Sequence, residues 1–288
     1  MASFSLSSID FDSLVRYALE EDVPYRDVTT NILIPHETQA TATILAKQDL
    51  TVAGIPLVRK VFEVLDPAVT VTVHSGDGTS INSGQVIARL EGNARTTLTG
   101  ERVALNFLQH LSGIATLTRK FCEAIRGYPA KILDTRKTTP GLRKLEKWAV
   151  TMGGGLNHRQ SLSDGILIKD NHLAVLKAQG VDIIDACRTA KEKGPHGLKL
   201  CVEIDSLEQI DQALEGEADV ILLDNMTPVL VQQAVHQIKG RAIIEVSGGI
   251  TLANVREFAA AGAEFISIGS LTHSAPAVDI SLEIQSSP

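Results

Sequence analysis

The sequence predicts an α/β fold with a parallel sheet, and three features of its pattern support this prediction. From about residue 130 onward, short apolar runs alternate with segments of helical periodicity, as in strand–helix–strand units with right-handed crossovers. The N-terminal part instead holds an amphipathic helix and then segments in which apolar and polar residues alternate, which is typical of half-buried strands. Residues 278–284 alternate in the same way, so we expect the tail to return to the N-terminal sheet.

The N-terminal part is expected to begin with a helix capped by Asp10. The apolar face of this helix consists of Phe11, Leu14, Val15, Ala18 and Leu19. Strands are predicted at residues 69–73 and 86–90. A helical stretch follows over about residues 97–127, and we expect it to be broken near Ser112 and Gly113.

The C-terminal part is expected to contain six strands. They cover residues 131–134, 166–169, 198–203, 220–224, 242–246 and 265–268. Helical patterns lie between most of them, for example at Leu207, Ile210 and Leu214, and then at Leu230, Ala234, Val235 and Ile238. Because a complete barrel of this kind has eight strands, we expect an incomplete or open one.

Composition excludes some classes of function. The 288 residues include 27 basic and 34 acidic side chains, so the net charge of −7 argues against a general nucleic-acid or membrane-surface binder. The three cysteines are widely spaced and include no C-x-x-C pair, which fits a reducing compartment and gives no support to a zinc site. The start lacks a basic leader followed by an apolar stretch, and no apolar run is long enough to span a bilayer. We therefore expect a cytoplasmic protein.

Functional-type residues follow each predicted C-terminal strand. The successive strand ends read DTRKT (134–138), KDNH (169–172), EID (203–205), DN (224–225), SGG (247–249) and GS (269–270). In parallel α/β folds these carboxyl ends converge on one face, where active sites lie. The sequence therefore predicts an active site between Asp134 and Ser270.

The first half of this series supplies cations. They are Arg136, Lys137, Arg143, Lys144, His158, Arg159 and Lys169. Arginine suits carboxylates and phosphates because its planar head donates two parallel hydrogen bonds. So many cations predict a substrate, or a pair of substrates, with several negative charges. For Arg143 and Lys144 a solvated helix face is an equally good interpretation.

The second half supplies carboxylates and glycine turns. Glu203 and Asp224 could bind ribose hydroxyls, hold magnesium or stabilise a developing positive charge. Alternatively, they could simply balance the nearby lysines. Turns at Ser247-Gly248-Gly249 and Gly269-Ser270 would expose backbone N–H groups to a phosphate. The combination suggests a sugar phosphate together with a polyanionic co-substrate.

Classical nucleophilic chemistry is not indicated. The sequence shows no Ser/His/Asp arrangement, and the histidines outside these segments are taken as surface or structural residues: His36, His74, His110, His196, His236 and His273. A barrel aldolase with Lys169 as a Schiff base remains an alternative. A non-enzymatic alternative is a lipoyl-type carrier modified at Lys47.

Jointly, the motifs resemble those of the quinolinate phosphoribosyltransferase family. The resemblance lies in DTRKTTPG (134–141), GGGLNHR (153–159), LIKDNH (167–172), VEIDSLEQ (202–209), LLDNM (222–226), SGGI (247–250) and IGSLTHSAPAVDISLEI (268–284), with EEDVPYRDVTT (20–30) and GERVALNFLQHLSGIAT (100–116) nearer the start. It covers nearly the whole chain. The implied fold is an N-terminal α/β sandwich domain, formed by residues 1–112 and 275–288, plus an incomplete parallel α/β barrel over residues 113–274.

The resemblance also implies an activity and a division of labour. A pentosyl-transferring enzyme would join quinolinate to 5-phosphoribosyl 1-diphosphate with Mg²⁺, giving nicotinate mononucleotide, carbon dioxide and pyrophosphate in NAD synthesis. Arg136, His158, Arg159 and Lys169 would grip the quinolinate carboxylates, joined by Arg102 from a neighbouring subunit of at least a homodimer. Substrate binding would also involve Thr135 and Lys137, with Lys137 facing the diphosphate. Glu203 and Asp224 would lie at the ribose and the magnesium ion, and Ser247, Gly248, Gly249, Gly269 and Ser270 at the 5-phosphate.

One alternative stays within this group of enzymes. A related type II phosphoribosyltransferase could act on another heterocycle. The number of cations discriminates between the two, because a neutral base or a monocarboxylate would not need so many.

Overall fold

The computed structural model describes residues 11–285, and the chain divides into two compact units. The first unit comprises residues 1–119, 144–154 and 274–288, and the second comprises residues 120–143 and 155–273. The predicted domain boundaries differ from this division, because residues 113–119 and all of helix α5 (Arg143–Met152) except Arg143 group with the first unit. One contact that ties α5 there joins His110 Nε2 and the buried Glu146 Oε1, 2.9 Å apart.

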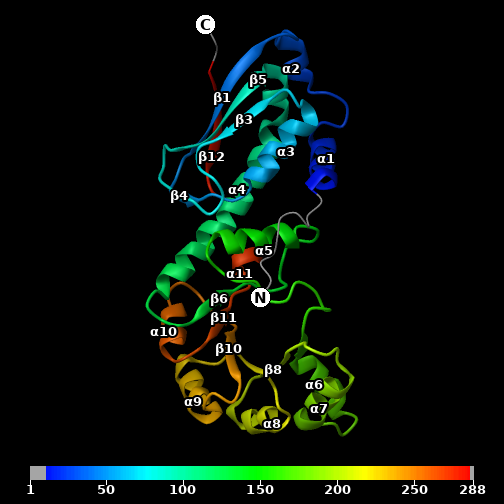
Figure 1. Cartoon of the computed structure of the whole chain (residues 1–288), viewed down its shortest axis with the longest axis vertical. Coiled ribbons are helices and arrows are strands. Elements are labelled where there is room, and N and C mark those ends of the chain that lie inside the picture. The colour runs from blue at the N-terminus through cyan, green and yellow to red at the C-terminus, as the bar shows by residue number, and fades with distance from the viewer. Residues whose placement is uncertain (1–10, 286–288) are drawn as a thin grey trace. The chain divides into compact units, whose positions relative to one another are not determined.

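The first unit is built on an antiparallel sheet with strand order β12-β1-β5-β3 (Figure 1). The tail strand β12 pairs with β1, with Ile280 opposite Ala46, which is the arrangement that the alternation of the tail predicted. The elements of this unit besides α5 are α1 (Phe11–Asp22), α2 (Val28–Leu33), β1 (Gln39–Ala46), β2 (Leu50–Thr51), α3 (Ile55–Leu65), β3 (Thr70–Val73), β4 (Ser80–Ile81), β5 (Val86–Asn93), α4 (Ala94–Ala124, whose last residues belong to the second unit) and β12 (Ile280–Gln285). Asp10, the predicted cap of α1, lies outside the described residues.

The predicted break in the long helix is wrong, because α4 runs unbroken through Ser112 and Gly113. Gly113 serves a different purpose. A Cβ atom there would lie only 2.2 Å from the carbonyl oxygen of Pro276, so glycine lets the tail pass close to the helix. The Ser112 hydroxyl bonds the backbone of Ala53 instead of ending the helix.

The second unit is a six-stranded, wholly parallel sheet with strand order β6-β11-β10-β9-β8-β7. The strands are β6 (Lys131–Leu133), β7 (Ile166–Ile168), β8 (Leu200–Ile204), β9 (Val220–Asp224), β10 (Ile243–Ser247) and β11 (Phe265–Ser267). The helices are α6 (Asp170–Lys177), α7 (Ile183–Lys193), η2 (Leu207–Gln209), α8 (Ile210–Glu215), α9 (Pro228–Ile238), α10 (Val255–Ala260) and α11 (Ser270–His273). Each predicted strand is present with ends shifted by two residues or fewer.

The sheet is an incomplete barrel, as predicted. Its first strand in the chain, β6, lies beside its last, β11, as in a closed barrel. The two edges are β6 and β7, which follow each other in the sequence. The connection between them contains α5, which belongs to the first unit by its contacts. The barrel is therefore open between β6 and β7, because the helix that connects these strands does not pack in the second unit.

The central strands are continuous apolar runs, as expected for parallel strands covered on both faces. All five residues of β8 are buried, and in β9 only Asp224 is partly exposed. Helix α9 begins with Pro228 after the cap Thr227, whose side chain accepts the N–H of Leu230. Within residues 11–285, no helix combines the length and the apolar character needed to cross a membrane.

Candidate active site

A cavity of about 740 Å³ lies at the carboxyl ends of the parallel strands. Its lining includes every predicted site residue of the second unit: Thr135, Arg136, Lys137, His158, Arg159, Lys169, Glu203, Asp224, Ser247, Gly248, Gly249, Gly269 and Ser270. A neighbouring hollow of about 880 Å³ shares Glu203 and Asp224, but of the cations it has only Lys177. We therefore place the candidate site in the smaller cavity, where cations, carboxylates and glycine turns meet.

The floor of the cavity is set by the register of three strands. Glu203, Leu222 and Glu245 stand side by side on β8, β9 and β10. Two residues earlier, Cys201 belongs to an apolar cluster that also contains Val220 and Leu222. Burial, and then the charges of Glu245 and Glu203, raise the pKa of the Cys201 thiol well above its usual value. A layer of carboxylates therefore lies directly above an apolar layer.

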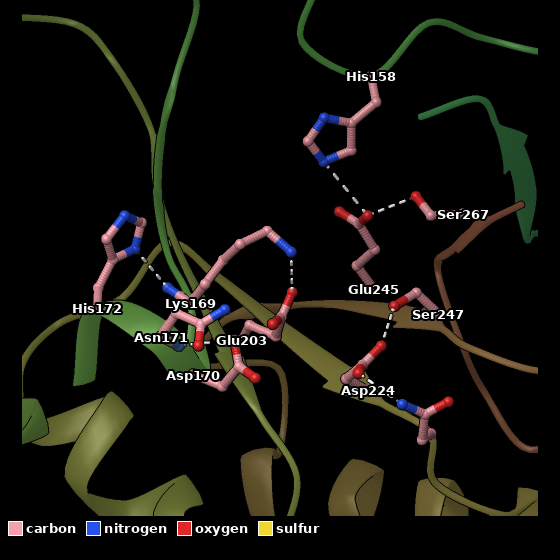
Figure 2. A network of polar contacts seen from close by, with 11 residues as sticks. His158, Lys169, Asp170, Asn171, His172, Glu203, Asp224, Glu245, Ser247 and Ser267 are labelled. Carbon is pink, nitrogen blue, oxygen red and sulfur yellow. Dashed lines mark hydrogen bonds and ion pairs between the residues drawn. The ribbon is translucent and has the colours of Figure 1, made fainter. Parts of the chain in front are cut away.

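Lys169 and Glu203 form an ion pair across the strand ends (Figure 2). Lys169 Nζ lies 2.7 Å from Glu203 Oε2, and the side chains are 43% and 9% exposed. Lys169 follows β7 and begins α6, where its backbone N–H is accepted by His172 Nδ1. The lysine is thus a cation of the cavity lining that is held by a buried carboxylate. A Schiff base would require this nitrogen to leave that partner.

Asp224 connects the ends of β9 and β10. It accepts hydrogen bonds from the hydroxyl of Ser247 at 2.5 Å and from Asn225 Nδ2 at 2.7 Å. Gly248 has a φ of 90°, and a Cβ atom there would lie 2.1 Å from Asn225 Oδ1. Only glycine fits at this position. The turn that follows β10 is therefore held rigidly against the carboxylate.

The positive charges of the guanidinium groups on the cavity wall are only partly balanced by negative charges of the protein. Burial, and then the like charge of Arg136, lower the pKa of Arg159. Arg136 Nε is buried and has no hydrogen-bond partner among the described residues. Because two close cations are stabilised by an anion placed between them, this wall suits an acidic ligand.

Arg143 is neither a cavity cation nor part of a solvated helix face. Its guanidinium donates to Thr138 Oγ1 at 3.0 Å and to the backbone oxygens of Gln160 and Arg136 at 3.3 and 3.4 Å. It therefore braces the two loops that carry Arg136 and Arg159. Lys144, in contrast, is exposed.

The loop with His158 and Arg159 is anchored by the fully buried Asp134. Its carboxylate accepts Asn157 Nδ2 at 2.6 Å and the backbone N–H of His158 at 2.9 Å. In turn, His158 Nδ1 accepts the backbone N–H of Arg159 at 2.7 Å. Arg159 Nη1 donates to the carbonyl oxygen of Gly165. Each residue of this loop is thus fixed by a named contact.

Sequence reasoning missed Glu245 and Ser267, which also line the cavity. Glu245 Oε1 accepts the Ser267 hydroxyl at 2.5 Å and lies 3.3 Å from His158 Nε2 (Figure 2). The available signal was an acidic residue inside the otherwise apolar strand IIEVS, a pattern shared with LCVEI of β8. His273, which was taken as a surface or structural residue, is exposed and also lies in the lining of this cavity.

Arg102 lies on α4 in the first unit and is not among the residues that line the cavity. Its side chain is 60% exposed, and Nη2 is 4.0 Å from Glu101 Oε1. The guanidinium thus makes one long contact with its neighbour. The prediction that it serves the site of a partner subunit stays a prediction.

Family models match both parts of the chain. The model of the N-terminal domain of quinolinate phosphoribosyl transferase matches residues 27–112, and the model of its C-terminal domain matches residues 114–283. The chain belongs to the quinolinate phosphoribosyl transferase family. The predicted family is thereby confirmed, and the cavity lies within the segment that the C-terminal model matches.

Relatives of this family are similar over almost the full length. The chain is 41% identical to the nicotinate-nucleotide pyrophosphorylase [carboxylating] of Mycobacterium leprae, covering 97% of this chain and 100% of that protein. It is 40% identical to a probable enzyme of the same name from Bacillus subtilis, covering 97% and 95%. The solved nicotinate-nucleotide pyrophosphorylase of Francisella tularensis is 36% identical, with a TM-score of 0.89 over 96% of each chain.

The carboxylates fit a magnesium ion that arrives with a substrate better than one held by protein alone. Within the described residues, no group of three or more His, Cys, Asp or Glu side chains is arranged to hold a metal ion. Glu203 and Asp224 are each already engaged by a neighbouring donor. Mg²⁺ commonly takes only one or two carboxylates and completes its shell with substrate phosphates and water.

Proposed function

We propose that this protein transfers the phosphoribosyl group of 5-phosphoribosyl 1-diphosphate to quinolinate, with decarboxylation to nicotinate mononucleotide, carbon dioxide and pyrophosphate. This is the carboxylating nicotinate-nucleotide pyrophosphorylase reaction of de novo NAD synthesis. The chain belongs to this family, and the observation that supports the proposal most strongly is a cavity whose lining combines the guanidinium groups of Arg136 and Arg159 with glycine turns and carboxylates.

Quinolinate would bind on the cationic side of the cavity. Arg136, Arg159 and Lys169 are the donors for its two carboxylates, because a dianion relieves the repulsion between the arginines. His158 lies on the same wall, with both ring nitrogens close to protein atoms. A neutral base or a monocarboxylate would leave part of this positive charge without a partner.

The phosphoribosyl donor would bind across the opposite side. Backbone N–H groups around Ser247, Gly248, Gly249, Gly269 and Ser270 would hold the 5-phosphate. Glu203 and Asp224 would accept the ribose hydroxyls. Thr135 and Lys137 would face the diphosphate, and the Lys137 side chain passes within reach of Gly269, where an added Cβ would lie 3.0 Å from Lys137 Cδ.

Mg²⁺, bound with the diphosphate, would neutralise charge on the leaving group. Glu203 and Asp224, which line the cavity, are the residues of this chain that would hold it. The protein contributes the fixed positions of these oxygens.

The chain's own residues would act in two stages. As the C–O bond to the diphosphate breaks, Lys137 stabilises the negative leaving group, while Glu203 and Asp224 stabilise the positive ribosyl ring. The quinolinate nitrogen then bonds to the ribose and becomes cationic. Only then does loss of carbon dioxide leave an electron pair that the ring can stabilise, after which that ring carbon takes a proton.

One assay tests this function. Purified protein with quinolinate, the phosphoribosyl donor and Mg²⁺ should release carbon dioxide and form nicotinate mononucleotide in equal amounts. Lys169→Ala, prepared identically, excludes a contaminating enzyme if its activity is nearly lost. Equal or better use of nicotinate, or no use of quinolinate, would contradict the proposal and favour a related enzyme for another heterocycle.

We also propose a homodimer with shared sites, in which Arg102 reaches the quinolinate site of the partner. Its support is the exposed guanidinium of Arg102 and the exposed apolar side of α2, where Val28, Ile32 and Leu33 are more than half exposed. Such a face is typical of an interface, and a two-fold interface would create two equivalent composite sites.

Complementation tests the shared site. At quinolinate concentrations below the wild-type KM, homodimers of Arg102→Ala and of Lys169→Ala should each be nearly inactive. A heterodimer of the two would hold one doubly damaged site and one intact site, so activity should return on co-refolding in proportion to the heterodimer. Heterodimers that form but stay inactive would mean that Arg102 serves its own chain.

A reducing compartment, and hence the cytoplasm, is the proposed location. Its support is that Cys122, Cys187 and Cys201, all in the described part of the chain, form no disulfide. Burial raises the pKa of Cys187 to about 11, so this thiol is suited to packing and not to reactivity.

A further inference from the structure

Glu245 is the one carboxylate on the cavity floor for which the proposed reaction has no task. Its side chain is 5% exposed, it stands level with Glu203 across β9, and it faces a cavity proposed to bind anions. A buried carboxylate beside an anion-binding cavity repels the anion, so its presence has to be explained by the protein groups that it contacts. Its partners therefore indicate its purpose.

The contacts around Glu245 determine which nitrogen of His158 carries the proton. Because Nδ1 accepts the backbone N–H of Arg159 at 2.7 Å, Nδ1 has no proton of its own. The neutral ring must then carry its proton on Nε2, which lies 3.3 Å from Glu245 Oε1. Figure 2 shows the ring directed at this carboxylate, and the Ser267 hydroxyl directed at the same oxygen.

The same ring connects Glu245 to Arg159. The protonated side of the imidazole faces β10, and its acceptor side holds the backbone of the next residue. Asp134 fixes the other end of this short loop through the N–H of His158. Any rotation of the ring would release the N–H of Arg159, and with it the backbone that aims this guanidinium into the cavity.

We propose that Glu245, with Ser267, is a positioning residue that holds His158 as its Nε2–H tautomer and thereby aims Arg159 at the acceptor carboxylate. His158 then supports the anion site from behind and does not itself bond the substrate. The role of Glu245 is that of a hydrogen-bond acceptor, and its charge is incidental. The kinetic part of this inference rests on the proposed function, whereas the tautomer of the free protein does not.

Two substitutions separate an acceptor from a charge. Glu245→Leu removes the acceptor at similar volume and should raise the KM for quinolinate about tenfold, the effect of one lost hydrogen bond at its upper range. Glu245→Gln keeps an oxygen at this place and should rescue most of that loss, leaving this KM within about threefold of wild type. In both variants kcat and the KM for the phosphoribosyl donor should change by less than about twofold.

A matched control is Glu264→Gln. Glu264 precedes β11 and accepts the N–H of Ile244 at 3.0 Å, but it does not line the cavity. Glu264→Gln should leave kcat, the KM for quinolinate and the KM for the phosphoribosyl donor unchanged. Ser267→Ala, which leaves both Glu245 and His158 in place, should raise the KM for quinolinate about threefold and gives a second test if Glu245→Leu fails to fold.

The decisive readout is the ¹⁵N NMR spectrum of histidine-labelled free protein, with His158 assigned through His158→Gln. Wild type should show His158 protonated at Nε2 and not at Nδ1, and Glu245→Leu should show a mixture of tautomers. A proton on Nδ1 in wild type, or the same tautomer in Glu245→Leu, would overturn the inference. So would an equal rise of both KM values. A wild type that does not use quinolinate would refute the proposed function alone, because the NMR result stands without it.

Discussion

Glu203 and Glu245 occupy equivalent positions in neighbouring parts of one sheet, yet their surroundings differ. Both interrupt apolar strands, both flank Leu222 in register, and both line the cavity. Glu203 is paired with the ammonium of Lys169, whereas Glu245 accepts the hydroxyl of Ser267 and faces His158. The same side chain at the same level is therefore balanced by a full charge in one case and by hydrogen-bond donors in the other.

This difference separates two uses of a buried carboxylate. A carboxylate paired with a substrate-facing cation can respond to charge that develops on the substrate. A carboxylate enclosed by protein donors can only fix the groups around it. We therefore expect changes at Glu203 to affect the chemical step and changes at Glu245 to affect the fit of the acceptor.

The largest effect is expected where charge matters. Glu203→Gln and Asp224→Asn should each lower kcat about a hundredfold, with milder effects on quinolinate binding, because the charge is needed as the ribosyl cation develops. Steady-state rates at saturating Mg²⁺ measure this. Near-normal turnover of both amides would remove the carboxylate pair from the account.

Replacing Lys169, the cation that faces Glu203, should affect quinolinate binding more than turnover. Lys169→Ala should raise the KM for quinolinate about tenfold to a hundredfold, and that for the donor far less, because it removes a charge-assisted bond worth roughly 1.5–3 kcal/mol. Lys169→Arg should also be poor, since a forked head does not replace a point charge.

Lys191→Ala is the matched control for this change, because Lys191 forms a Lys–Glu pair of 3.1 Å with Glu217 outside the cavity. It should leave both KM values unchanged. If Lys169→Ala weakened both substrates equally, the assignment of Lys169 to the quinolinate carboxylates would be lost.

A carboxylate in the first unit extends the comparison to a structural role. Asp77 accepts the backbone N–H groups of Gly54 and Ile55 at the start of α3, and burial raises its pKa to about 6. Since the folded state holds the proton more tightly than the unfolded state, Asp77 contributes stability that is full below about pH 4 and is lost as pH rises through about 6.

Asp77→Asn keeps the acceptor oxygen and cannot titrate. Wild type and variant should therefore have similar free energies of unfolding at pH 4, and the variant should be more stable at pH 7 by on the order of 1–3 kcal/mol. Denaturant titrations at the two pH values measure the difference. Kinetic constants should not change, and a changed KM for quinolinate would show that Asp77 is more than a helix cap.

Much of the site was predictable because it follows a simple rule. Polar residues at or directly after the ends of apolar strands converge at one edge of a parallel sheet, and by this rule Arg136, Lys169 and Asp224 were expected together, as they lie in the cavity lining. Glu245 lies inside its strand and not after it, so this rule overlooked it. Its partner His158 lies in the loop between α5 and β7, and its partner Ser267 ends β11, so only the folded chain brings them together.

The errors in the predictions for Gly113 and Arg143 also arise from contacts between distant parts of the chain. By local preference a glycine interrupts a helix, but Gly113 is required by the close approach of Pro276. Arg143 has the sequence context of a solvated helix residue, yet it braces two loops through three hydrogen bonds. In each case the deciding partner lies elsewhere in the chain, where periodicity carries no information.

The central claim is that Glu203 acts through its charge and Glu245 through its position. The direct test compares Glu203→Gln with Glu245→Gln, since the amide removes the charge but preserves shape and an acceptor oxygen. We predict that kcat falls about a hundredfold in Glu203→Gln and less than about twofold in Glu245→Gln. Equal losses of kcat in the two variants, or a larger loss in Glu245→Gln, would contradict the account.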